Sequence, residues 1–508
     1  MNSSIVLYPI LWQAIISIVL MFFWQRTYLQ RIVSIIGSAI GLALALVLFT
    51  MVWNNGILVV QAGNWAAPFG ITMVADLFAA SLVLLTHIVA FAVSIYSKET
   101  IISSRVRFGY FPIYHLLIMG LSGAFLTGDI FNLYVWFEVI IISSFVLLTL
   151  GGKHAQIEGA VKYFTLNMLA SIIFLTAIAL LYGVTGTLNM AELSRIVPQI
   201  ENQGLIQIIA IIFFTGFGIK AGVFPLYFWL PASYHAPPAA VSAVFGGLLT
   251  KVGVYALIRI FTLIFTPDTF NSTLIMWTAA LTLLSGGLGA LVQKDITKVF
   301  SYLIICHIGF MIAGLSLNME IALIGAIFYM FHDIIVKANL FLVGGLLYRI
   351  NGTTKIDQMG GLLNTYPKLA VLIAIPLFSL VGIPPLSGFW PKLSLFQASF
   401  ASENYLLLGF MIFASFITLV IIARLWNNVV SKPVDNAPVV STKFRYFQTF
   451  SRYEKSAMIT PIVFLSAVSL YIGFGAEHIH TIVSKIGYEL MHTEGYYDAV
   501  FNTLNSQR

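Results

Sequence analysis

Single charged residues stand inside long apolar stretches of this 508-residue chain. Glu138, Lys220 and Lys392 each lie near the middle of a stretch that has no other charge and is long enough to cross a bilayer. A charged side chain at the centre of a membrane costs at least ~2.5–3.5 kcal/mol, so it usually marks a path for ions or protons. Several such residues in one chain indicate a protein that moves charge across a membrane.

The composition restricts the chain to the membrane class. Hydrophobic residues make up 59% of it, charged residues 9%, and the mean hydropathy is +0.95, whereas a soluble domain carries about 25% charged residues. The single cysteine, Cys306, excludes a disulfide framework and an iron–sulfur cluster built by this chain alone. No GxxxxGK[ST] loop is present, which argues against ATP as the direct energy source.

Hydrophobic runs of bilayer length predict an all-α polytopic membrane protein with fourteen transmembrane helices. The first run lacks a basic leader and a small-residue cleavage site, so we expect it to be a retained helix. The predicted spans are 3–23, 32–53, 71–96, 108–127, 130–150, 161–183, 205–229, 237–264, 272–292, 299–317, 321–348, 369–399, 404–426 and 456–475.

Basic residues alternate between the loops. Of the 26 basic residues, 18 are assigned to loops that follow odd-numbered predicted helices and only two, Arg195 and Arg259, to loops that follow even-numbered ones, while the other six lie in spans or in the C-terminal tail. Because cytoplasmic loops are enriched in Lys and Arg, we expect the odd-numbered helices to end in the cytoplasm. Both termini are then non-cytoplasmic.

Two predicted helices, 205–229 and 369–399, each combine glycines, proline and one lysine at mid-membrane depth. Paired broken helices are typical of transporters built from inverted repeats. We therefore predict two inverted five-helix repeats, helices 4 to 8 (108–264) and 9 to 13 (272–426), with broken helices 7 and 12. A three-helix segment (1–107) precedes them, and a cytoplasmic loop, helix 14 and a non-cytoplasmic tail (427–508) follow. Two ordinary proline kinks are the alternative.

The isolated charges suit a proton relay. Burial raises the pKa of a carboxylate and lowers that of a lysine, whereas pairing opposes both shifts. Making and breaking a Glu138–Lys220 pair would therefore switch the lysine between holding and releasing its proton. A static buried ion pair is the alternative, but Lys220, Lys251 and Lys392 cannot all pair with one carboxylate.

The predicted helix 321–348 carries His332, Asp333 and Lys337. Asp333 and Lys337 are i,i+4 neighbours that could pair on one face, and His332 titrates nearest physiological pH. A hydrogen-bonded core histidine is the alternative for His332. For His235 and His307 a relay role and a loop or packing role are equally open. Asp76, near the start of the third helix, is expected to cap that helix or to line an entrance.

Several motifs resemble the antiporter-like subunits that Mrp sodium/proton antiporters share with respiratory complex I, over roughly residues 70–430. These motifs are Phe224–Pro238, Leu249–Tyr255, Asp295–Gly309, Lys337–Leu342 and Gly382–Lys392. Within the family, Gly63–Gly70 and Gly388–Lys392 favour the D-type subunits of Mrp antiporters.

The resemblance implies a role for each matched residue. Glu138 and Lys220 are similar to a paired switch, Lys251 to the central lysine, His332 to a relay histidine, and Lys392 to the terminal lysine. It also implies a non-enzymatic transporter subunit that exchanges sodium for protons. The expected setting is a hetero-oligomer with other Mrp subunits and lipid in the cytoplasmic membrane. No cofactor, metal or nucleic acid is expected.

Three other functions stay open on the sequence. The first is a proton-pumping subunit of complex I or of a membrane-bound hydrogenase, driven by electron transfer in partner subunits. The lysine at 392, where one complex I paralogue has glutamate, argues against that paralogue. The second is an inactive scaffold, which the intact charged set disfavours, and the third is a stand-alone transporter.

Overall fold

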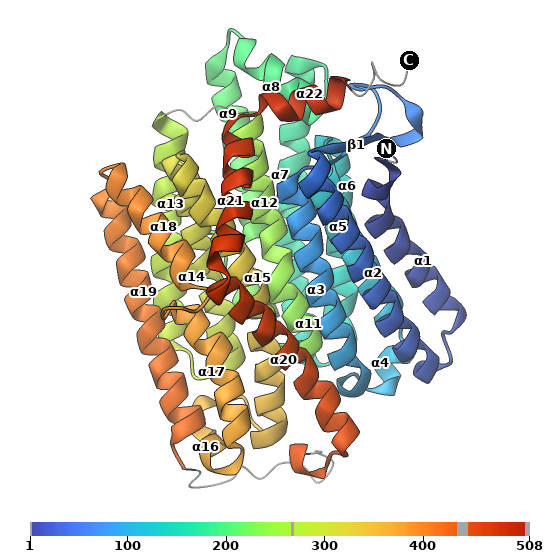
Figure 1. Cartoon of the computed structure of the whole chain (residues 1–508), viewed down its shortest axis with the longest axis vertical. Helices are drawn as coiled ribbons and strands as arrows, with labels where there is room; N and C mark the ends of the chain where they lie inside the picture. The colour runs from blue at the N-terminus through green and yellow to red at the C-terminus, as the bar shows by residue number, and fades with distance from the viewer. Residues whose placement is uncertain (1–2, 266–268, 434–445, 503–508) are drawn as a thin grey trace.

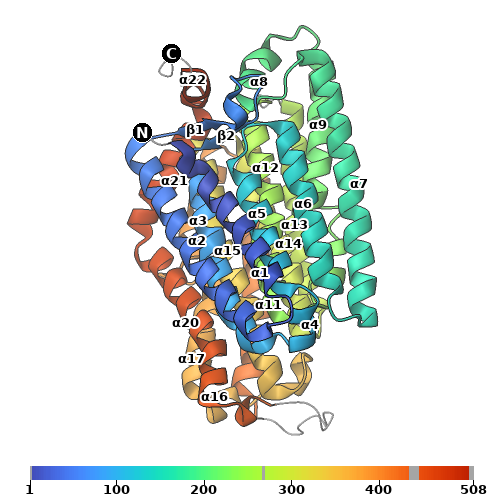
Figure 2. The same ribbon diagram turned by 90° about the vertical axis from the view of Figure 1, so that its right-hand side faces the viewer.

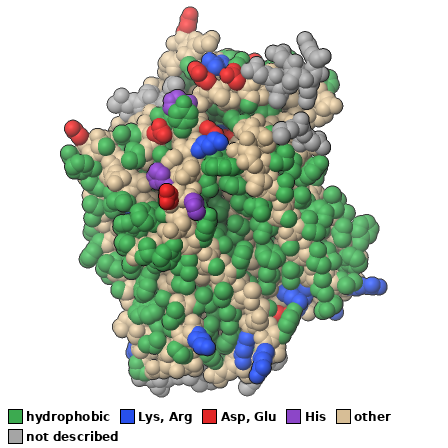
Figure 3. Space-filling model, viewed as in Figure 1, with side chains coloured by type: hydrophobic (Ala, Val, Ile, Leu, Met, Phe, Trp, Pro, Cys, Tyr) green, Lys and Arg blue, Asp and Glu red, His purple; other side chains and the backbone are tan. Residues whose placement is uncertain are grey.

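A computed structural model describes residues 3–265, 269–433 and 446–502. Its helices run side by side along the long axis of the molecule and form one bundle (Figures 1 and 2). Apolar side chains cover most of the face that Figure 3 shows, which is the surface expected of a protein in lipid.

Short helices lie between some of the long ones along the chain. The longer helices are α1 (Tyr8–Phe22), α2 (Thr27–Asn55), α3 (Leu77–Thr100), α5 (Tyr110–Leu126), α6 (Ile130–Thr149), α7 (His154–Thr185), α9 (Gln203–Ala221), α12 (Thr250–Leu263), α13 (Thr269–Val292), α14 (Ile296–Leu317), α15 (Glu320–Asn351), α17 (Pro367–Val381), α18 (Phe389–Ala401), α19 (Tyr405–Leu425), α20 (Arg452–Phe474) and α21 (Ala476–Met491). The shorter ones are α4 (Ser103–Arg107), α8 (Met190–Ile196), α10 (Trp229–Ser233), α11 (Ala239–Val244), α16 (Leu362–Thr365) and α22 (Glu494–Asn502).

Twelve helices within the described ranges are long and apolar enough to cross a membrane. Two shorter apolar helices, α5 and α17, fall where the sequence predicts the fourth and twelfth spans. The spans at 161–183 and 32–53 are longer in the structure, as α7 and α2. Their extra turns carry polar residues, which a hydropathy pattern does not assign to a span.

The expectation of an all-α chain needs one correction. Strands β1 (Leu58–Gln61) and β2 (Thr72–Ala75) pair antiparallel, with Leu58 opposite Ala75. The segment that the sequence assigned to the start of the third span therefore begins as a strand, and α3 starts only after Asp76. This small sheet lies at the same end of the bundle as α8 and α22 (Figure 2).

The segment after the last predicted span is also helical. α20 crosses the face of the bundle diagonally, and α21 continues from it toward the end where α22 lies (Figure 1). α20 ends at Phe474 and α21 starts at Ala476, so the two meet at Gly475. α21 buries Ile479, Val483 and other apolar residues of one face, so the tail is a packed element of the bundle.

The two ends of the bundle differ in charge. On the face shown in Figure 3, Lys and Arg side chains gather near the lower end, whereas most Asp and Glu side chains lie near the upper end. The lower end includes α4 with Arg105 and Arg107, and the N-terminus and α22 lie at the upper end (Figure 1).

Candidate functional site

The first predicted interruption is present at the end of α9. α9 stops at Ala221 because Gly222 takes the left-handed conformation (φ +82°), which is open to glycine at little cost. The chain then crosses to the short helix α10. The Phe224 N–H freed at this point donates to Thr282 Oγ1 (2.9 Å), and the Trp229 indole donates to the Ile219 carbonyl (3.0 Å). Polar neighbours thus satisfy backbone groups that a continuous helix would have paired.

Lys220 lies in the last turn of α9 and is buried. Its Nζ donates to Ser171 Oγ of α7 (3.0 Å) and lies 4.6 Å from the centre of the Phe137 ring. A cavity of about 10 Å³ beside it is lined by Tyr163 and Asn167, which leaves space for no more than about one water molecule. The lysine therefore sits in a small, nearly dry pocket.

Glu138 and Lys220, which the sequence predicts to pair and to separate, are not paired in this structure. Glu138 lies on α6 and is partly exposed, its Oε1 is buried without a hydrogen-bond partner, and no ion pair joins it to the lysine. The residue before it, Phe137, carries the ring that faces Lys220. The Glu138 carboxylate is nevertheless close enough to interact electrostatically with Lys220.

Lys251 lies two residues after the end of a π-helical turn, Phe245–Leu249, which separates α11 from α12. π-helical turns inside helices frequently mark functional sites. Lys251 Nζ donates to the Gly246 carbonyl (2.8 Å) and forms an ion pair with Asp333 Oδ2 of α15 (2.6 Å). Both side chains are fully buried.

Asp333 is the centre of the buried cluster. Besides Lys251, its Oδ1 lies 3.2 Å from His307 Nδ1 of α14 and 3.9 Å from Lys337 Nζ. The i,i+4 pair expected from the sequence is thus the longer of two lysine contacts, because Lys251 approaches from another helix. The hydrogen bond to Asp333 assigns His307, left open by the sequence, to this cluster.

The second interruption follows α17. α17 stops at Val381, and Gly382 takes the left-handed conformation (φ +87°) before α18 begins at Phe389. Lys392 in α18 reaches back and donates to the Val381 carbonyl (2.7 Å). His332 of α15 bonds through Nδ1 to Ser387 Oγ (2.7 Å) in the segment between the two half-helices.

The buried groups form a row across the bundle. α12 packs on the end of α9 so closely that a Cβ on Gly253 would lie 2.5 Å from Ala221 N. The row therefore passes from Lys220 on α9 to Lys251 on α12, then to the α15 cluster and finally to Lys392 on α18. These residues come from helices far apart in the sequence.

A cavity of about 510 Å³ opens at the basic end of the bundle. It is lined by Ser242 of α11 and Gly344 of α15, nine residues before Lys251 and seven residues after Lys337, and by Arg105 and His235. His235 also lines a neighbouring cavity of about 330 Å³. Burial lowers the pKa of His235, so its imidazole is neutral at physiological pH. Two of the residues that line the larger cavity, Ser242 and Gly344, thus belong to the helices that carry Lys251 and Lys337.

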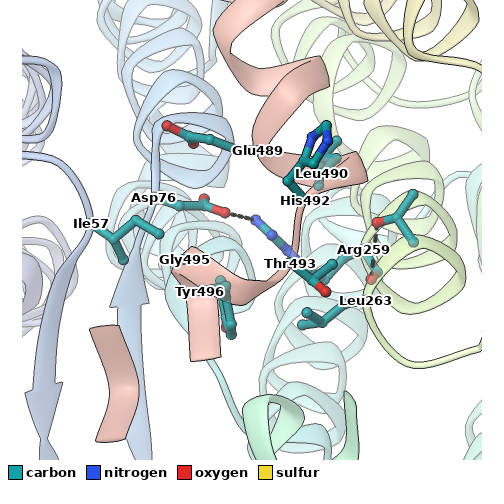
Figure 4. A pocket seen from close by; sticks show the side chains of 11 residues that line it. Ile57, Asp76, Arg259, Leu263, Glu489, Leu490, His492, Thr493, Gly495 and Tyr496 are labelled. Atoms are coloured by element: carbon teal, nitrogen blue, oxygen red, sulfur yellow. Dashed lines mark hydrogen bonds and ion pairs between the residues drawn. The ribbon is translucent and has the colours of Figure 1, made fainter. Parts of the chain in front are cut away.

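The opposite end has a smaller polar cluster (Figure 4). Asp76 caps α3, since its Oδ1 accepts from Ala79 N (2.8 Å), and its Oδ2 pairs with Arg259 of α12 at 2.5 Å. They line a cavity of about 30 Å³ with Glu489 of α21, and burial, with Asp76 nearby, raises the pKa of Glu489 to about 7. Asp76 thus both caps its helix and lines a cavity. Arg259 lies inside α12 and not in a loop.

Glu489 was missed by sequence reasoning because it lies in the segment interpreted as a solvated tail. The signal was present: apolar residues of 476–491 recur at helical spacing on one face, as in Ile479, Val483, Ile486 and Leu490. Such an amphipathic pattern predicts a helix that packs against the bundle.

Comparison with known proteins relates this geometry to a family. Residues 127–418 match the family described as NADH:quinone oxidoreductase/Mrp antiporter, TM. The chain is 42% identical to the D-type subunit of the Na(+)/H(+) antiporter of Alkalihalophilus pseudofirmus, over 98% of this chain and 99% of that one. A chain in the structure of the Mrp complex from Dietzia sp. DQ12-45-1b superposes with a TM-score of 0.89 at 27% identity, covering 99% of this chain and 100% of that one.

A chain of the membrane-bound sulfane sulfur reductase, an archaeal respiratory membrane complex, is also similar. Its TM-score is 0.88 at 26% identity, over 97% of this chain and 99% of that chain. The fold is therefore found both in an antiporter complex and in a respiratory one.

Proposed function

Because the chain belongs to the NADH:quinone oxidoreductase/Mrp antiporter family, we propose that it is the proton-translocating subunit of a multisubunit sodium/proton antiporter. Its partners are the other subunits of that complex, and it resides in the cell membrane as a multi-pass protein. The observation that carries the proposal is the row of buried lysines, with Asp333 and His332, that links the two broken helices.

The proposed path starts at the large cavity of the basic end. Its lining includes Ser242 and Gly344, which lie on the helices that carry Lys251 and Lys337, and the ion pair between Lys251 and Asp333 lies at the middle of the row. A proton that reaches a neutral lysine converts it to an ammonium, which then attracts the nearest carboxylate. Exchange of partners around Asp333 moves the positive charge along the row toward Lys220 or Lys392.

Glu138 acts as a movable partner in this scheme. Its separation from Lys220 corresponds to the open state of the switch, in which Lys220 is bonded only to a neutral hydroxyl. Approach of the carboxylate would favour the charged lysine, and its withdrawal would favour release of the proton. Sodium travels by another route, since a row rich in ammonium groups repels cations.

The architecture fits this role. We infer fourteen spans, counting α5 and the α17–α18 pair with the twelve long apolar helices, and two inverted repeats at 108–264 and 272–426. The segment 1–107 precedes the repeats and 427–508 follows them. With the basic end in the cytoplasm, both termini are non-cytoplasmic.

Charge-conserving and charge-removing variants test the relay. Lys220→Arg and Lys392→Arg keep the positive charge but cannot release a proton, because arginine stays protonated in proteins. Glu138→Gln keeps the size but not the charge. In everted membrane vesicles that contain the whole complex, each variant should lower sodium-dependent proton movement at least about tenfold, with normal assembly. Normal exchange in both arginine variants would disprove the relay.

The likeness to the sulfane sulfur reductase favours a second candidate, a proton-pumping subunit of a redox-driven complex. The two differ in their energy source. Sodium-dependent proton movement in vesicles without an electron donor supports the antiporter, and proton movement only on addition of a donor supports the redox-driven pump.

A further inference from the structure

A chain of serine hydroxyls leads away from His332. Ser387, in the break between α17 and α18, bonds His332 Nδ1 at 2.7 Å and Ser469 of α20 at 3.0 Å. Ser469 in turn donates to Ser379 of α17 at 3.3 Å. All four side chains are buried, so water does not compete for these bonds.

α20 is fixed at this place by close contacts with the break. A Cβ on Gly473 would lie 2.7 Å from the Pro385 carbonyl, and the Trp390 indole donates to the Gly473 carbonyl (2.9 Å). The position of Ser469 relative to Ser387 is therefore set by backbone packing. Ser469 lies outside the residues that match the family, 127–418.

The direction of the hydrogen bonds follows from counting hydrogens. A serine hydroxyl has one hydrogen to donate. Ser469 donates its hydrogen to Ser379, so in its bond with Ser387 it is the acceptor. Ser387 therefore donates its own hydrogen to Ser469 and can only accept from His332. His332 Nδ1 must then carry a proton.

A proton on Nδ1 leaves Nε2 as the basic nitrogen of the neutral ring. His332 Nε2 is buried without a partner, and it lies 3.0 Å from the position that a Cβ on Gly388 would take. It thus faces the start of α18, the helix that carries Lys392. The charged groups around the ring are Asp333 and Lys337 on its own helix, Lys392 on α18 and Lys251 on α12. α17 and α20 contribute hydroxyls.

We propose that Ser387 and Ser469 are positioning residues that fix the tautomer of His332, so that relay protons arrive at and leave from Nε2. In each cycle one proton from a neighbouring lysine ammonium binds Nε2, the ring becomes an imidazolium, and the same proton then leaves Nε2. The Nδ1 proton stays on His332, donated to Ser387 Oγ, throughout. This inference rests on the proposed function, since it assumes that His332 carries protons.

Ser469→Ala tests the proposal. Without Ser469 the Ser387 hydrogen is free to turn toward His332, which favours the opposite tautomer and blocks Nε2. In vesicles with the intact complex, the rate of exchange should fall about tenfold at the optimal pH, and the pH of half-maximal rate should shift. Ser469→Thr keeps the hydroxyl and should restore both the rate and the pH profile.

Ser466→Ala is the matched control. Ser466 lies on the same buried face of α20, where it accepts from Asn339 Nδ2 (2.9 Å) and not from the His332 chain. It should leave the pH profile unchanged. A purely structural role of Ser469 would lower the amount of assembled complex, or the rate equally at every pH, and would overturn the inference.

A His332→Ala variant separates this inference from the proposed function. If His332→Ala loses exchange and Ser469→Ala retains the wild-type rate and pH profile, the tautomer proposal is wrong and the relay stands. If His332→Ala itself exchanges normally, His332 is not in the path, and both the inference and this part of the proposed relay are wrong.

Discussion

The two broken helices share a backbone plan but use their lysines differently. Each half-helix ends at a glycine with positive φ, Gly222 or Gly382. In the first break a neutral donor, the Trp229 indole, satisfies the Ile219 carbonyl, and Lys220 bonds a serine hydroxyl elsewhere. In the second break the ammonium of Lys392 itself satisfies the Val381 carbonyl.

The buried carboxylate of the second half, Asp333, also makes more contacts than Glu138, the carboxylate of the first half. Asp333 is fully buried and contacts Lys251 and His307, whereas Glu138 is partly exposed and its buried Oε1 has no hydrogen-bond partner. In the second half, the groups proposed to carry protons also make contacts that stabilise the fold. In the first half, other groups make the stabilising contacts. Variants in the second half should change stability as well as transport, and those in the first half mainly transport.

The largest contrast is expected between Asp333→Asn and Glu138→Gln. Removing one partner of a buried ion pair typically costs about 3–5 kcal/mol, and Asp333→Asn leaves Lys251 unpaired. We expect Asp333→Asn to lower the recovery of assembled complex severely, and Glu138→Gln to leave recovery normal. Thermal unfolding of the purified complex, with recovery from membranes, measures both. Equal losses of stability would remove the difference between the halves.

Replacing Lys220 or Lys392 by methionine should show a second difference in stability between the two breaks. Lys392→Met leaves the Val381 carbonyl without its donor, which costs about 1–3 kcal/mol for a buried group. Lys220→Met leaves the Ile219 carbonyl bonded to Trp229. Both variants should stop exchange, but only Lys392→Met should lower the melting temperature of the complex clearly. A larger loss for Lys220→Met would contradict our account of how each break is supported.

Alanine at the two glycines gives a smaller, graded effect. The left-handed conformation costs a residue with a Cβ about 1–2 kcal/mol. At Gly382 the new Cβ would also lie 3.0 Å from the Gly388 carbonyl, whereas at Gly222 it would meet only a Leu230 methyl at 3.2 Å. Gly382→Ala should therefore reduce stability and exchange more than Gly222→Ala, measured side by side in one preparation. The reverse order would show that the breaks are not governed by local backbone geometry.

The smallest effect is expected at the surface pair of Glu158 and Lys162 on α7, whose oxygen and nitrogen lie 2.6 Å apart. Both side chains are more than half exposed, and such i,i+4 pairs contribute about 0.3–0.5 kcal/mol. Glu158→Gln should leave exchange and melting temperature unchanged within error. It serves as the control for Glu138→Gln, because it removes a carboxylate from the same half without touching the row.

The sequence predicted the features that depend on local chemistry. Glycine and proline beside Lys220 and Lys392 predicted both interruptions, since these residues disfavour a helix wherever they are placed. The isolated charges predicted Lys220 and Lys392 as members of the row, because an apolar setting makes each one costly.

Partners across helices were not predictable. Asp333 has Lys337 one turn away in sequence, yet Lys251 lies closer because the approach of α12 decides the contact. Ser469 gave no signal, since a serine in a transmembrane helix usually bonds the preceding turn of its own helix. Ser387 lies in the break, and its partners depend on how α15 and α20 approach that segment.

The π-helical turn before Lys251 gives α12 one residue more than an α-helix of equal height would contain. In an α-helix each residue advances the side-chain direction by about 100°. If the turn Phe245–Leu249 closed to an ordinary α-helix without losing a residue, everything beyond it would rotate by that angle. Lys251, Tyr255 and Arg259 follow each other at four-residue spacing on one face, so they would rotate together. A rotation of α12 about its axis at the centre of the membrane would therefore also move the Arg259 guanidinium, at the far end of the helix, away from Asp76.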